Sequence, residues 1–161
     1  MASEPILDTE LAHFLQSGVA MHAASVSGRT PQVTRAAGCR VSPDLRSVTI
    51  FVVTSHSEAL LADLRAHGSI AVVFTRPKSH RTVQLKGTDA RVLALAPGDA
   101  ELAWRQVDVF NAELAALRFA PELGRTLLGG GESPLAAVTF TPTSAFVQTP
   151  GPAAGTALKR S

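Results

Sequence analysis

The sequence predicts a mainly β protein of the α+β class, in which six antiparallel strands form one sheet that closes on itself and carries flanking helices. A chain of 161 residues is long enough for one domain that buries roughly two-thirds of its unfolded surface. Hydrophobic residues make up 45% of the chain and charged residues 17%, which argues against disorder. Consecutive strands are joined by short turns, and the regular strand–helix alternation of a parallel sheet is missing. We therefore expect a single domain over residues 1–161.

The first third of the chain predicts a helix followed by a hairpin. Four apolar residues recur at helical spacing before Ser17-Gly18, namely Leu7, Leu11, Phe14 and Leu15. The segments GVAMHAASVSG and QVTRAAGCRV are compatible with strands, and the turn signal SGRTP separates them. A second turn at Ser42-Pro43-Asp44 leads into SVTIFVVT, a third strand with β-branched residues on both faces.

The central part predicts a short helix between strands. In SHSEALLADLRAHG, Ser57 stands at the N-cap and Gly68 follows the last turn, so we expect a short capped helix. The next segment, SIAVVFTRP, predicts a buried strand that ends at Pro77. RTVQLKGTDARVLAL alternates apolar and polar residues, which predicts one half-exposed strand with a bulge or bend at Gly87.

The last third predicts one long helix and one strand. After Pro97-Gly98-Asp99, apolar residues follow at steps of 4, 3, 4 and 3, as in an amphipathic helix: Ala103, Val107, Phe110, Leu114 and Leu117. GGGES predicts a flexible loop and lacks the Lys-Ser/Thr that a phosphate-binding P-loop requires. LAAVTFTPTSAFVQT predicts the last strand, and we expect residues 152–161 to form a flexible tail.

Composition excludes several classes of function. A net charge of +2 spread over a whole domain, with 5% aromatic residues and no tyrosine, argues against a nucleic-acid partner. Five histidines stand apart and Cys39 is the single cysteine, so we expect no dedicated metal site and a small buried thiol at Cys39. No GxSxG motif marks a serine nucleophile. Short apolar runs and an acidic start without a signal-peptide pattern predict a cytoplasmic protein with no membrane partner.

Donors suited to a phosphate group occur near the ends of three predicted strands. Arg35 lies inside an otherwise apolar strand, and Arg81 and Thr82 open a strand after the basic loop RPKSHR. At the strand-to-helix junction, Thr54, Ser55 and Ser57 add hydroxyl groups to the free N–H groups of a helix start. An equally good interpretation from the residues alone is that Arg35 pairs with an acid and the RPKSHR loop is merely solvated.

Three stretches together resemble the FMN-binding split-barrel superfamily, the pyridoxamine 5′-phosphate oxidase-like proteins. They are GVAMHAASVSGRTPQVTRAAG, IFVVTSHSEALLADLRAHGSIAVVF and RTVQLKGTDARV, which cover nearly half of the chain in the order that the superfamily has. The resemblance implies an antiparallel six-stranded split β-barrel with flanking helices. It also implies an FMN cofactor that lies between the two subunits of a homodimer.

The resemblance also implies which residues hold the cofactor. Arg35, Ala36 and Ala37 would follow the FMN phosphate and ribityl chain, and Val53 and Thr54 would approach the flavin ring. Three further positions would lie near the phosphate or the ring: Ser57, Arg81 and Thr82. The superfamily has Ser-Arg-Lys where this chain continues from Ser57 with Glu58, and Lys78 or His80 would replace the missing charge. The phrase AFVQTPGP resembles an element of small members, in which Phe146, Gln148 and Thr149 would border the flavin.

The function that follows is a homodimeric FMN-binding oxidoreductase acting on an unidentified small molecule. A true pyridoxamine phosphate oxidase is not expected, because the long C-terminal segment with tryptophan and arginine is missing and Trp104 is the single tryptophan. One alternative is a reductase that uses a deazaflavin cofactor, held by Lys78, Arg81 and Lys86. Another is a binding protein without catalysis that carries flavin or haem, with His80 or His22 as the axial ligand.

Overall fold

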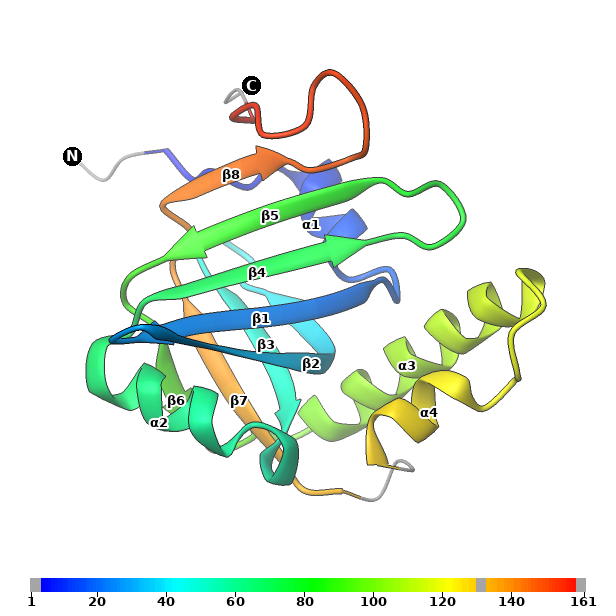
Figure 1. Ribbon diagram of the computed structural model, residues 1–161, viewed down its shortest axis with the longest axis horizontal. Helices are drawn as coiled ribbons and strands as arrows, with labels where there is room; N and C mark the ends of the chain where they lie inside the picture. Colours follow the sequence, from blue (N-terminus) through cyan, green and yellow to red (C-terminus); the bar gives the residue numbers. More distant parts are fainter. Residues whose placement is uncertain (1–3, 130–132, 159–161) are drawn as a thin grey trace.

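One antiparallel sheet forms the centre of the computed structural model, which describes residues 4–129 and 133–158 (Figure 1). Within these ranges the sheet has eight strands in the order β6-β7-β3-β2-β1-β4-β5-β8. The strands are β1 Ala20–Ser27, β2 Thr30–Val41, β3 Val48–Val53, β4 Ile70–Thr75, β5 Thr82–Gly87, β6 Arg91–Leu93, β7 Leu135–Phe140 and β8 Ser144–Val147. The helices are α1 Thr9–Leu15, η1 Thr54–His56, α2 Glu58–His67, α3 Asp99–Ala116 and α4 Leu123–Leu127. The α+β class and the antiparallel sheet are confirmed.

The strand count differs from the six that the sequence predicts, because two predicted strands each divide in two. The segment after Arg81 forms β5, which pairs with β4, and then β6, which pairs with β7. The chain turns at Gly87, where a Cβ atom would lie 2.8 Å from both the Phe140 ring and the carbonyl of Thr141. The last predicted strand divides around Pro142 into β7, which pairs with β3, and β8, which pairs with β5. Each division carries the chain from one end of the sheet to the other.

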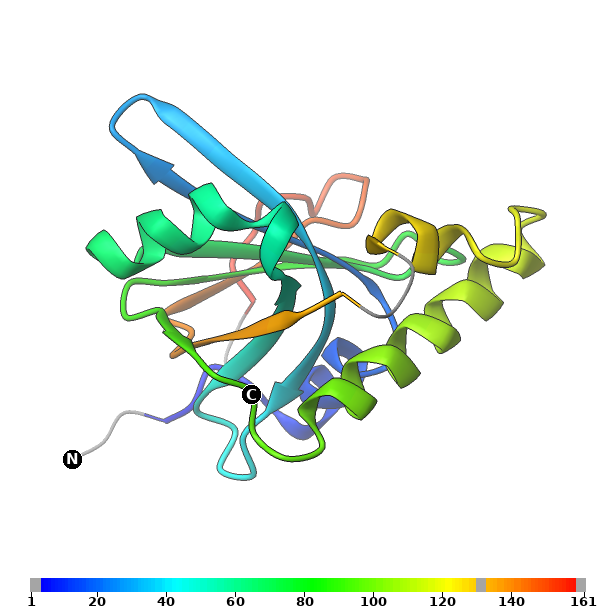
Figure 2. The ribbon, with the colours of Figure 1, turned by 90° about the horizontal axis from the view of Figure 1, so that it is seen from below.

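The predicted hairpin is present as β1 and β2, paired from Met21–Ala36 to Ser27–Thr30. Against β3, β2 contains a bulge, because Ala36 lies opposite Val52 whereas Gly38 lies opposite Phe51. Ala37 is the extra residue. Figure 2 shows that the tip of this hairpin extends past the neighbouring strands.

Two apolar clusters lie on opposite sides of the sheet. The larger cluster fills the inside of the barrel and includes Phe14 and Leu15 from α1 and Leu60 and Leu64 from α2. The smaller cluster lies outside, beneath α3 and α4, and is formed by Ala37, Phe51, Val53, Ala103, Val107, Leu128 and Ala137. The long amphipathic helix is therefore confirmed, although Leu117 lies past its end and is 42% exposed. The sequence did not predict α4, a five-residue helix.

The start of α2 differs from the expected cap. Ser57 stands at the N-cap, but its hydroxyl makes no capping hydrogen bond and instead lies 2.9 Å from the hydroxyl of Thr34. The two hydroxyls lie buried between β2 and the helix. Because the Ser57 hydroxyl is bonded to Thr34, it does not cap α2. At the other end, Gly68 adopts the left-handed conformation with φ of 70°, as predicted.

The C-terminal segment folds back along β8. The amide of Val147 donates to the carbonyl of Thr156, and the amide of Leu158 donates to the carbonyl of Ala145. Residues 155–158 of the predicted flexible tail therefore lie against the sheet edge, whereas 159–161 and most of the GGGES loop lie outside the described residues. In the described ranges no helix is long and apolar enough to span a membrane.

Candidate functional site

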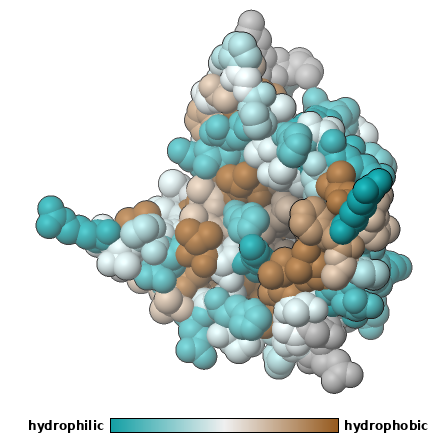
Figure 3. Space-filling model, turned by 45° about the vertical axis from the view of Figure 1, so that its right-hand side comes forward, coloured by the Kyte–Doolittle hydropathy of each residue, from teal (hydrophilic) through white to brown (hydrophobic). Residues whose placement is uncertain are grey.

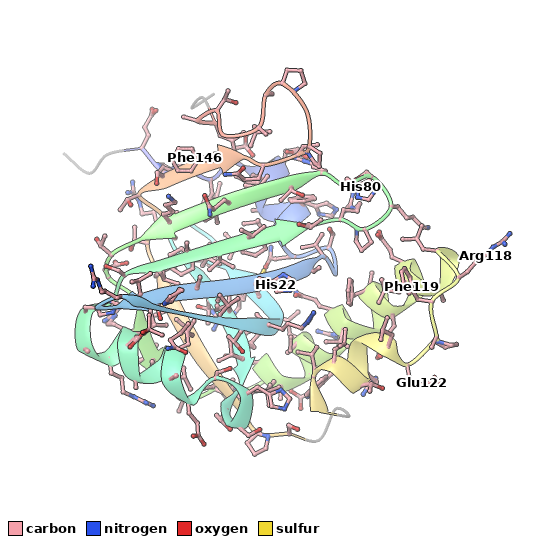
Figure 4. All side chains as sticks on the ribbon, viewed as in Figure 1. His22, His80, Arg118, Phe119, Glu122 and Phe146 are labelled. Carbon is pink, nitrogen blue, oxygen red and sulfur yellow. The ribbon has the colours of Figure 1, made fainter. Side chains whose placement is uncertain are left out.

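The outward side of strands β1, β4, β5 and β8, and of β2 as far as Arg35, has no described helix over it, and in Figure 1 strands β1, β4, β5 and β8 face the viewer. We call this side the uncovered face. Residues that alternate with the buried core positions point toward it. Cross-strand pairing aligns five of them in one line across five strands, which we call the anchor row: Arg35, His22, Val73, Gln84 and Phe146. Figure 4 shows His22 on β1 and Phe146 on β8, at separate places along this line.

Small side chains flank the anchor row on both sides. One neighbouring line runs through Ala20, Thr75 and Thr82, and the hydroxyls of the two threonines lie 3.1 Å apart. The other line runs through Val33, Ala24, Ala71, Lys86 and Ser144. Apart from Lys86, the two lines beside the anchor row thus consist of short side chains.

A cavity of about 100 Å³ opens beside the Arg35 end of the anchor row. We call it the alcove. Its walls come from β1, β2, α3, α4 and adjacent loops: Val19, Ala20, Met21, His22, Arg35, Ala36, Ala37, Val107, Phe110, Gly124, Leu127 and Leu128. Only Arg35 and His22 carry polar side chains in this set, and both are exposed. Figure 3 shows apolar patches between hydrophilic residues on the side of the molecule that includes α3 and α4.

The alcove exists because α3 is held close to the bulge in β2. A Cβ atom on Gly38 would lie 2.9 Å from Cα of Ala103, so only glycine admits the helix at this distance. Gln106 on α3 accepts a hydrogen bond from the amide of Cys39 and donates one to the carbonyl of Cys39, both at 2.8 Å. Its carboxamide thereby pairs with β2 in the place of a neighbouring strand, because β1 reaches along β2 only as far as Ala36.

The electrostatics of the alcove mouth are positive. Arg35 makes no hydrogen bond or ion pair with any residue in the described ranges. Its cross-strand partner is His22, and partial burial, followed by the positive charge of Arg35, lowers the pKa of His22 below 6.5. The lowered pKa favours the neutral imidazole, next to a guanidinium that has no partner among the described residues. This finding removes the alternative in which Arg35 pairs with an acid of the described chain.

Three of the predicted cofactor residues meet at the alcove: Arg35, Ala36 and Ala37. Their side chains point in different directions. Ala36 packs into the barrel interior, whereas Ala37 joins the cluster beneath α3. Only Arg35 presents a charged group to solvent here, so it is the member of this set that can hold an anion.

The predicted residues at the end of β3 lie next to β2 but are mostly turned inward. Val53 is fully buried in the cluster beneath α3. The Thr54 hydroxyl donates to the carbonyl of Pro134 at 3.2 Å. Ser57 is 2% exposed and is bonded to Thr34, which precedes Arg35 and points to the opposite side of β2.

The predicted residues around the β4–β5 turn divide between two surroundings. Thr82 lies on the uncovered face, and its hydroxyl donates to the carbonyl of His80 at 2.9 Å. Arg81 turns away to α1, where its guanidinium makes two hydrogen bonds to Glu10, of 2.6 and 2.8 Å, and lies over the Phe14 ring. These bonds raise the pKa of Arg81 and lower the pKa of Glu10. Lys78 is exposed on the turn.

The residues predicted from AFVQTPGP also come near the uncovered face. Phe146 ends the anchor row, and the Gln148 amide donates to Gln84 at 3.3 Å. Thr149 accepts from the amide of Thr82 at 2.9 Å. Val73 and Gln84 were not predicted as site residues. His22 was predicted only in the alternative in which it is a haem ligand.

Two further groups bear on the chemistry. Cys39 is fully buried, its thiol donates to the carbonyl of Leu15, and burial raises its pKa, so the expectation of a small buried thiol is confirmed. Within residues 4–129 and 133–158, no group of three or more His, Cys, Asp or Glu side chains is placed to hold a metal ion.

Comparison with known proteins rests on structure. No protein-family model matches the chain, and no curated protein matches its sequence. HupZ of Group A Streptococcus superposes with a TM-score of 0.55 at 15% identity, over 92% of this chain and 100% of that chain. A Lactobacillus delbrueckii protein described as a candidate pyridoxamine 5′-phosphate oxidase superposes with a TM-score of 0.52 at 16% identity, over 91% of this chain and 97% of that one.

A third solved structure is a Clostridium acetobutylicum protein related to general stress protein 26 of Bacillus subtilis, from the pyridoxinephosphate oxidase family. It superposes with a TM-score of 0.50 at 16% identity, over 86% of this chain and 84% of that one. Identities this low establish a shared fold. The chain therefore has the split-barrel fold of the pyridoxamine 5′-phosphate oxidase-like superfamily, as the sequence resemblance predicts.

Proposed function

We propose that this protein is a homodimeric flavin-binding oxidoreductase that holds FMN on the uncovered face. The observation that carries the proposal is the anchor row, which starts at Arg35, an arginine without a partner among the described residues, and has mostly short side chains on either side of it. FMN joins a phosphate of nearly two negative charges to a flat and largely apolar ring system. The row offers a complementary partner to each of these parts.

Arg35 is the proposed phosphate anchor. Its guanidinium is exposed and free of partners among the described residues, so the phosphate would displace no existing ion pair. Charge-assisted hydrogen bonds of this kind contribute roughly 1.5–3 kcal/mol. Arg81 fits this role less well, because Glu10 already holds both of its terminal nitrogens.

The ring system would lie over the middle of the face. β2 and β5 are three strand spacings apart, roughly 14 Å at the usual ~4.8 Å per spacing, which suits an extended ligand. Val73 offers an apolar contact there, and Gln84 offers a hydrogen-bonding group at the β5 side, whereas Thr82 is buried and its hydroxyl is bonded to His80. When bound, FMN supplies hydride-transfer chemistry, so the chain itself needs no acid–base triad.

A second copy of the chain would complete the site. Ligand pockets usually enclose about 300–1,000 Å³, whereas the alcove provides about 100 Å³ and the rest of the face is open on one side. The small half-buried residues Ala24, Ala71 and Val73 make this face suitable for close packing against another flat surface. This shape supports a homodimer with the cofactor between two such faces. Its substrate would be a small molecule that reaches the flavin from the remaining opening.

The test is a titration of the protein with FMN, in which the quenching of flavin fluorescence measures binding. Arg35→Gln should weaken binding by about tenfold or more, because it removes the charge-assisted bonds. Arg29→Gln is the matched control, since it removes the same charge from the exposed tip of the same hairpin and should leave the affinity unchanged. Equal affinity of the two variants, or no FMN binding by the unmodified protein, would refute the proposed function.

A further inference from the structure

The alcove has features that a flavin site alone does not explain. The apolar walls lie beneath α3 and α4, set back from the uncovered face, and include the buried residues Ala37, Val107 and Leu128. A cavity of about 100 Å³ is too small for a three-ring system. A closed apolar cavity of about 150 Å³ takes up a single benzene ring. The alcove is smaller but open at its mouth, so it admits at most one ring or a short branched alkyl group.

The side chains at the mouth of the alcove determine which polar group such a ligand carries. Arg35 and His22 face each other across β1 and β2, and none of the described residues that line the cavity carries a carboxylate. A ligand with its apolar body inside would place its polar end at the unpaired guanidinium, where an anion is favoured. A planar carboxylate matches the fork of N–H groups on arginine and can accept two of them at once.

We propose that the alcove binds a small carboxylic acid, whose single-ring or short-chain body fills the apolar cavity and whose carboxylate is held by Arg35 beside His22. The inference stands apart from the proposed function, because it needs only the cavity and its two rim residues. The two ligands are linked in one respect. The FMN phosphate and the acid would compete for the same guanidinium, so an acid of this class would also regulate how much flavin the protein retains.

The test uses benzoate as the probe. It is added to the protein without flavin, and binding is measured by NMR as chemical-shift changes of the backbone amides. Benzyl alcohol is the neutral comparison of the same size. Benzoate should bind saturably and shift the amides of His22, Arg35 and Ala37, and benzyl alcohol should bind about tenfold more weakly or worse, because it lacks the charge. Because flavin is left out, the result decides on the alcove whether or not FMN binds.

Two variants locate the ligand. Arg35→Gln removes the partner of the carboxylate at an exposed position and should weaken benzoate binding by about tenfold or more, with Arg29→Gln as the control. Ala20→Leu fills the cavity and should abolish binding, whereas Ala62→Leu, on the exposed side of α2, should not change it.

Three results would each overturn the proposal. They are an absence of benzoate binding, benzoate binding by Arg35→Gln with the affinity of the unmodified protein, and shifts that occur away from the alcove. Since Arg35 is exposed, its variant is expected to fold even where Ala20→Leu does not.

Discussion

At the scale of single residues, the pair formed by Arg35 and His22 sets the charge of the surface. The two side chains are cross-strand partners, so each is exposed to the other's electrostatic field. The positive charge of Arg35 disfavours a second positive charge on the imidazole. The titration of His22 therefore reports directly on the environment at the alcove mouth.

We predict that His22 titrates below pH 6.5 in the unmodified protein, measured by NMR of its ring protons. Arg35→Gln should move the pKa upward but leave it below 6.5, because burial is the larger cause of the shift. Arg29→Gln should have no effect. A midpoint at or above 6.5 in the unmodified protein would show that the imidazole is not placed as described.

The same shift affects stability with a definite sign. Between the pKa of folded His22 and 6.5, the unfolded chain binds more protons than the folded chain. The free energy of unfolding therefore falls as the pH drops through this window, and His22→Gln should remove that part of the dependence.

Part of this residue-level picture was accessible from the sequence. A hairpin with Gly28 and Arg29 in its turn pairs Ser27 with Thr30, and the same register brings His22 opposite Arg35. The sequence analysis predicted the hairpin and named Arg35 as a site residue, but it did not derive the pairing of Arg35 with His22. The ion pair of Arg81 with Glu10 was inaccessible, because it depends on where α1 lies against the barrel.

At the scale of elements, the contact between α3 and β2 shapes the alcove. The helix approaches the strand at Gly38, and Gln106 satisfies both backbone groups of Cys39. These contacts follow from the bulge at Ala37, which sets the strand's orientation beyond the end of β1. The wall of the cavity therefore depends on a few close contacts.

We predict that Gly38→Ala lowers the free energy of unfolding by about 1–3 kcal/mol, because its Cβ would overlap Ala103. Gln106→Ala should cost about 2 kcal/mol or more, since it leaves a buried N–H and a buried carbonyl unsatisfied. Urea denaturation measures both, and Gln32→Ala at a half-buried position of the same strand is the control. Variants as stable as that control would contradict the described contact.

The elements that the sequence predicted well are those with a strong local pattern. The hairpin, β3, α2, β4 and α3 all have apolar periodicities that match their surroundings. The divisions into β5 and β6, and into β7 and β8, were missed because alternation continues across both breaks. What divides these strands is their pairing with opposite ends of the sheet, a tertiary effect.

At the scale of the whole molecule, the described helices leave the outside of β1, β4, β5 and β8 uncovered. α1 and α2 pack into the barrel interior, and α3 and α4 cover the outside of β2, β3 and β7. The uncovered face carries the anchor row and the small residues beside it. An elongated flat cofactor, with a second copy of the chain above it, would bury this surface.

The most direct test of this account is an NMR titration of the full-length protein with FMN, in which amide shifts are mapped onto the sheet. The account predicts shifts along the anchor row, from Arg35 and His22 through Val73 to Gln84, and their loss in Arg35→Gln. Saturable FMN binding that leaves the amides of this row unchanged would contradict it.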